Sequence, residues 1–75
     1  MEEKVLEVME EIAEGSSTYD GDDLLEAGIL DSFLIMDLIA KLEETLQIRI
    51  GARQIIEENF KTKETIIEMV KTAQQ

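Results

Sequence analysis

Aliphatic residues recur at spacings of three and four in three separate stretches of this 75-residue chain. Residues 2–14, 32–47 and 63–73 each place their apolar side chains on one face of an α-helix. The chain has no cysteine, so helices this short have to be held together by packing alone. The sequence therefore predicts an all-α fold, a small three- to four-helix bundle with a long loop between the first and second long helices.

The first helix is predicted over Glu2–Glu14 and is expected to stop at Gly15, which small polar residues follow. The residues from Gly15 to Asp31 show no sustained period. Their leucines nevertheless indicate an ordered loop, because a long structureless loop is uncommon in a compact domain. A short helical turn is expected at Asp22–Ala27, with Asp20 or Gly21 before it.

The second helix, Ser32–Gln47, has the strongest pattern in the chain. Asp31 and Ser32 are both residues that commonly cap a helix N-terminus, and a carboxylate at Asp31 suits the positive end of the helix dipole. After this helix, Ile48–Ile50 forms a connector, and a short helical segment is expected over Ala52–Glu58. The last helix is expected to start after Thr62.

Charge and composition exclude several classes of function. The chain has 18 acidic against 7 basic residues, a net charge of −11, and neither histidine nor cysteine. A Ser-His or Cys-His nucleophile pair and the usual zinc sites are therefore absent, and we expect no enzymatic activity. The negative charge disfavours nucleic acids and anionic membrane surfaces, and no apolar run approaches the roughly 18 residues of a membrane span. We expect basic protein partners and, without a signal-like N-terminus, a cytoplasmic location.

The acidic run that begins at Asp20 does not fit a calcium-binding loop. With Asp20 and Asp22 at the first and third positions, Leu24 takes the fifth and Leu25 stands where glycine is required. Asp31 would replace the bidentate glutamate. These carboxylates are better interpreted as solvated, and no metal is expected.

Ser32 lies where the long loop meets the N-terminus of the strongest helix. Apolar residues on both sides would anchor it, so its hydroxyl would be held in a fixed, accessible place. The helix N-terminus favours a negative group, which makes a phosphodiester on Ser32 electrostatically compatible. The alternative is that Ser32 only caps the helix.

The run Gly28-Ile29-Leu30-Asp31-Ser32-Phe33, followed by an acidic amphipathic helix, closely resembles the attachment motif of the acyl carrier protein family. The resemblance covers essentially the whole chain, residues 1–75, as a single carrier-protein domain. It implies that Ser32 receives covalent 4′-phosphopantetheine from coenzyme A and that Asp31 is recognised by the phosphopantetheinyl transferase. The chain would then be a stand-alone carrier of a thioester-linked acyl or aminoacyl group. A D-alanyl type is compatible with the Leu-Asp-Ser sequence, and the cargo stays open.

The resemblance also implies a docking surface. Asp37, Glu43 and Glu44 match places where carriers present carboxylates to basic surfaces of acyl- or aminoacyl-loading and acyl-processing enzymes. Leu34 departs from the pattern of many fatty-acid carriers and is interpreted as an apolar partner contact, with an ordinary exposed aliphatic as the alternative. We expect a monomer. Two other functions remain open, an acidic helical interaction module without a prosthetic group and a mimic of nucleic acid.

Overall fold

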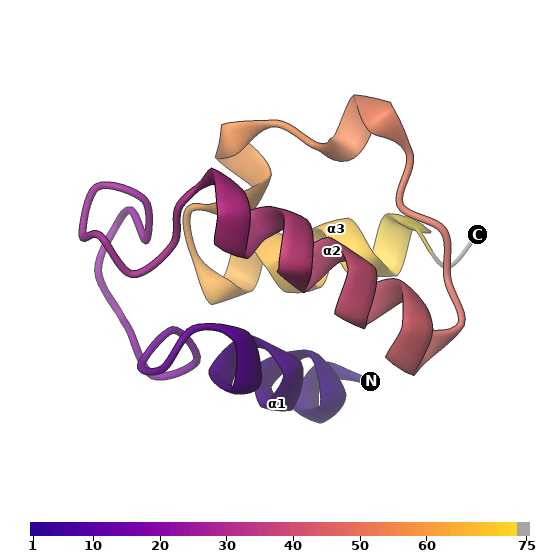
Figure 1. Ribbon diagram of the computed structural model, residues 1–75, viewed down its shortest axis with the longest axis horizontal. Coiled ribbons are helices and arrows are strands. Elements are labelled where there is room, and N and C mark those ends of the chain that lie inside the picture. Colours follow the sequence, from indigo (N-terminus) through magenta and orange to yellow (C-terminus); the bar gives the residue numbers. More distant parts are fainter. Residues whose placement is uncertain (74–75) are drawn as a thin grey trace.

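The computed structural model describes residues 1–73 and is helical throughout its regular structure. Over these residues there is no strand, which confirms the all-α prediction (Figure 1). The elements are α1 (Glu2–Ile12), α2 (Ser32–Leu46), the 3-10 turns η1 (Ala52–Gln54) and η2 (Glu57–Phe60), and α3 (Lys63–Ala73).

The three long helices enclose one apolar core. In Figure 1, α1 packs against α2 and α3, and the η1–η2 segment runs from the end of α2 to the start of α3. Most of the periodic residues of each helix are buried, and others are partly buried and pack against the core, namely Leu6, Ile12, Leu46, Ile67 and Ala73. Residues of the loops join them. The largest fully buried hydrophobic side chains are Phe60, Met9, Leu24, Leu38, Leu42, Ile66, Val5 and Val70. Burying an aliphatic or aromatic side chain contributes roughly 1.5–3 kcal/mol, so this core is the main source of stability.

Helix α1 ends at Ile12, two residues before the predicted end. Ala13 is already extended, with φ −140° and ψ 101°. The hydroxyl of the fully buried Ser16 donates to the carbonyl oxygen of Met9 at 2.8 Å, so the loop folds back under the helix end. That side-chain bond takes up a carbonyl near the helix end, and the chain turns earlier than its apolar pattern indicates.

The exposed Glu10 carboxylate stabilises the turn after α1 through hydrogen bonds. It accepts hydrogen bonds from the Ser17 hydroxyl at 2.6 Å, the Gly15 amide at 2.8 Å and the Ser17 amide at 3.3 Å. The hydrogen bond from the Ser17 hydroxyl is the largest cause that lowers the pKa of Glu10, and the Gly15 amide adds to it. Because these donors favour the ionised form, the contacts depend on pH.

Replacing Glu10 by alanine is expected to lower the urea midpoint of unfolding at neutral pH. The pKa of this carboxyl is lower in the folded state than in the unfolded chain. Its contribution to the free energy of unfolding is therefore complete above the unfolded pKa, and it is lost as the pH falls through the folded pKa. The deficit of the variant should therefore shrink on acidification. Glu7→Ala, an exposed position on the same helix, removes the same charge and serves as the control. An equal deficit at neutral and strongly acid pH would contradict this account.

The long loop is ordered, as predicted, and the expected turn is present over residues 24–28, where the Ala27 amide donates to the Asp23 carbonyl oxygen at 3.0 Å. The cap is Asp23 instead of Asp20 or Gly21, because the Asp23 carboxylate accepts from the amides of Leu25 at 3.0 Å and Glu26 at 3.2 Å. The neighbouring Leu24 is fully buried and its amide donates to the carbonyl oxygen of Lys61 at 2.7 Å. The loop is thereby fixed to the segment that leads into α3.

The short helical segment expected over Ala52–Glu58 is confirmed in part, because the structure divides it into two 3-10 helices, η1 and η2. The carbonyl oxygen of Gln54 accepts from the Asn59 side-chain amide at 2.7 Å and from the Ile56 amide at 3.0 Å, so the helix stops and two 3-10 turns form instead. The start of α3 after Thr62 is confirmed, since the Thr62 hydroxyl accepts from the Thr65 amide at 3.1 Å.

Candidate functional site

Ser32 is the first residue of α2, and the cap of this helix is Asp31. The Asp31 backbone is extended, and its carboxylate accepts from the Leu34 amide at 2.9 Å. Of the two residues that could have capped the helix, Asp31 is the one that does so. The Ser32 hydroxyl takes no part in the capping hydrogen bond. Ser32 is exposed. The position is therefore accessible, and the observed cap does not depend on the hydroxyl.

Buried residues on both sides hold Ser32 in place. Leu30 is 2% exposed and Ile35 is 8% exposed, so the chain is anchored in the core just before and just after it. The loop reaches Leu30 through Gly28, whose φ of 80° lies in the left-handed region that favours glycine. The attachment candidate therefore sits on a corner whose backbone is fixed while its side chain faces solvent.

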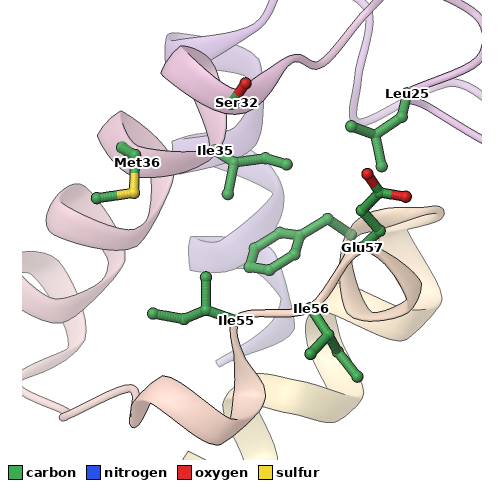
Figure 2. Close-up of a pocket in the computed structure, with 8 residues that line it drawn as sticks. Leu25, Ser32, Ile35, Met36, Ile55, Ile56 and Glu57 are labelled. Atoms are coloured by element: carbon green, nitrogen blue, oxygen red, sulfur yellow. The ribbon is translucent and has the colours of Figure 1, made fainter.

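A groove opens beside Ser32, with a volume of about 220 Å³. Figure 2 shows Ser32 and Met36 of α2 on one side and Ile55 and Ile56 of the η1–η2 segment on the other. The lining residues are Leu25, Ser32, Ile35, Met36, Ile55, Ile56, Glu57 and Phe60. The sequence leaves open whether such a groove exists, because its two walls are far apart along the chain.

The predicted acidic partner residues do not all have the same surroundings. Asp37 and Glu44 are exposed on α2, with the Lys41 ammonium 3.9 Å from the Glu44 carboxylate and 4.0 Å from that of Glu11. Glu43 is half-buried, and its carboxylate accepts from the Ile50 amide at 2.9 Å. Glu43 therefore holds the connector after α2, whereas Asp37 and Glu44 face solvent.

The apolar residues after Ser32 differ in how far their side chains are buried. Leu34, the predicted contact, is half-buried and packs against the core. Phe33 is 83% exposed and Met36 is 60% exposed, so these two carry the exposed apolar surface beside Ser32. Helical spacing could have identified them, since both lie on the face opposite Leu38.

Residues 1–73 hold neither a metal-binding cluster nor a membrane span. No group of three or more acidic side chains within this range is arranged so that it could hold a metal ion. None of its helices is both long and apolar enough to cross a membrane.

Comparison with known proteins gives one family match and several curated relatives. The family model described as phosphopantetheine attachment site matches residues 3–71. The chain is 32% identical over 75 residues to a D-alanyl carrier protein of Streptococcus uberis, which covers 99% of this chain and 95% of the relative. It is 34% identical over 68 residues to the D-alanyl carrier protein of Streptococcus sanguinis, which covers 89% of this chain and 86% of the relative. It is 31% identical over 67 residues to the D-alanyl carrier protein of Bacillus mycoides, which covers 87% of this chain and 85% of the relative.

Proposed function

The chain belongs to the phosphopantetheine attachment family of non-catalytic carrier proteins, and on that premise we propose that it carries an acyl or aminoacyl group as a thioester on 4′-phosphopantetheine attached to Ser32. The observation that supports Ser32 is its exposed hydroxyl at a fixed corner, with the cap of α2 supplied by Asp31. The intact Asp31-Ser32 pair favours a carrier over an interaction module without a prosthetic group.

The residues around Ser32 fit such a group. An exposed hydroxyl is open to a modifying protein, and the N-terminus of α2 favours the negative charge of a phosphodiester. The apolar groove next to Ser32 offers a surface along which the uncharged part of the arm can lie. When bound, the group supplies the thiol that this cysteine-free chain lacks.

The chain's own part in the attachment reaction is small. The Ser32 oxygen attacks the phosphorus that bears the pantetheine arm in coenzyme A, a new P–O bond forms, and adenosine 3′,5′-bisphosphate leaves. The hydroxyl proton passes to a base of the transferase, since this chain has no histidine. Asp31 holds the reacting corner through its cap and presents a carboxylate that the transferase recognises.

The partners in this proposal are the phosphopantetheinyl transferase and the enzymes that load and process the acyl or aminoacyl group. The chain acts as a monomer in the cytoplasm, where coenzyme A is available. Tethering raises the effective concentration of the cargo at each enzyme without a lasting complex. The names of the D-alanyl carrier relatives favour a small aminoacyl cargo.

Mass spectrometry tests the proposal directly. Incubation with coenzyme A, magnesium and a broad-specificity transferase is expected to add one phosphopantetheinyl group per chain, and peptide fragmentation is expected to place it on Ser32. A chain that gains no mass, or gains it at another residue, would rule out the proposed attachment.

Reversing the charge of Asp37 and Glu44 together to lysine is expected to reduce the rate constant of association with a basic partner on the order of tenfold at low salt. Both side chains are exposed, so the far-ultraviolet circular dichroism should change little. The measurement is the loading rate at limiting transferase, as a function of ionic strength.

The matched control is Glu3→Lys with Glu7→Lys, which changes the net charge equally on α1. If both double variants slow loading to the same extent, net charge and not the α2 surface governs the encounter. An unchanged rate in the α2 variant at low salt would remove Asp37 and Glu44 from the docking surface.

A further inference from the structure

Among the described residues that line the groove beside Ser32, Glu57 alone is charged. The rest of the lining is apolar apart from Ser32 itself. In Figure 2 the Glu57 carboxylate points toward Leu25, on the opposite side of the groove from Met36. Any group tethered at Ser32 that enters this groove therefore meets hydrocarbon walls and one negative charge.

The backbone that carries Glu57 is well anchored. Glu57 begins η2, and Phe60 at the end of the same turn is only 1% exposed. The Asn59 amide donates to the carbonyl oxygen of Ile56 at 3.0 Å, and η2 packs against α3. The backbone of Glu57 is thus fixed at the edge of the groove that its side chain lines, whereas the next residue, Glu58, does not line it.

This combination discriminates between cargoes by charge. Ile55 and Ile56 can contact the uncharged part of an arm, and neither offers a polar group that would select among cargoes. A positively charged end group is attracted to the Glu57 carboxylate, a neutral one is indifferent, and a carboxylate is repelled. The net charge of −11 reinforces the repulsion of anionic cargo.

We propose that Glu57 is a specificity-determining residue, which pairs with the ammonium of an aminoacyl cargo when the arm on Ser32 folds into the groove. The inference rests on the proposed function and names the class of cargo, a small α-aminoacyl group. Anionic acyl groups are disfavoured at this site. Because Glu57 is exposed, the pair contributes as a surface ion pair does, about a two- to fivefold change in occupancy.

The test loads the protein with three stable, amide-linked pantetheine analogues. Alanyl carries an ammonium, lactyl is its neutral isostere, and malonyl is anionic. At about pH 6.5, where an α-amino group is protonated, nuclear magnetic resonance records the backbone amide shifts of Ile55 and Ile56 relative to the unacylated holo protein. We expect groove occupancy to decrease from alanyl to lactyl to malonyl.

The variant E57Q should reduce occupancy by the alanyl form about two- to fivefold and remove its difference from the lactyl form. The matched control is E58Q, which removes the same charge one residue away and should leave the order unchanged. Salt of about 1 M should act as E57Q does, because its screening length is roughly 3 Å.

The possible failures are distinguishable. Loading is followed by intact mass, so a chain that gains no group overturns the proposed function and this inference with it. A loaded chain in which alanyl and lactyl give equal shifts at Ile55 and Ile56 overturns this inference alone. This inference is also overturned if the difference between the alanyl and lactyl forms persists in E57Q. The same holds if that difference is lost in E58Q as well as in E57Q.

Discussion

Replacing Ser32 by alanine is expected to abolish phosphopantetheinylation completely while changing the free energy of unfolding by less than about 0.5 kcal/mol. The two effects separate because the hydrogen bond that caps α2 is made by Asp31 and not by the Ser32 hydroxyl. Alanine is also a good helix former at an exposed first position. Intact mass after exhaustive incubation with transferase, together with urea unfolding, measures both.

Asp31 variants supply the complementary control. Asp31→Ala removes the capping acceptor and should cost about 1 kcal/mol, whereas Asp31→Asn keeps an acceptor at the cap and should cost little. Slower loading of both variants would mean that the transferase recognises the charge, independently of the cap. Residual mass gain in Ser32→Ala, or a stability loss as large as that of Asp31→Ala, would contradict the roles given to the two residues.

Replacing Phe60 by alanine is expected to lower the free energy of unfolding by about 3–5 kcal/mol. The ring is 1% exposed and is among the largest fully buried side chains of the core. A domain of this size has a total stability of roughly 4–11 kcal/mol, so the variant should be partly unfolded at the lower end of that range. The urea midpoint, followed by far-ultraviolet circular dichroism, measures the loss.

Ile56→Ala is the matched control, since Ile56 lines the same groove but is 47% exposed. It should cost about 1 kcal/mol, because only about half of its apolar surface leaves water on folding. Equal losses in the two variants would show that Phe60 is less buried in solution than in this structure.

The elements predicted correctly are those that local signals specify. The spacing of apolar residues placed the long helices, and an acidic residue before a helical pattern marked the start of α2. The errors lie where a side-chain hydrogen bond to the backbone ends a helix. Helix α1 ends early because Ser16 reaches back to Met9, and the segment after Gly51 breaks because Asn59 binds the Gln54 carbonyl. Neither bond is visible in a helical pattern.

The candidate site divides in the same way. Asp31 and Ser32 can be predicted as site residues because motif and cap are contiguous, whereas Ile55, Ile56 and Glu57 join Ser32 only in the folded chain. The sequence could assign Glu43 a charge but not its hydrogen bond to the Ile50 amide. Which of the predicted acidic residues meet a partner stays a prediction.

The bond between the Glu43 carboxylate and the Ile50 amide holds this side chain against the connector after α2. The amide uses only one of the two carboxylate oxygens, so the other stays able to accept from a basic group. An arginine or lysine that meets Glu43, as the docking prediction has it, would find a carboxylate already held in place. Ordering this side chain on binding would then cost little conformational entropy.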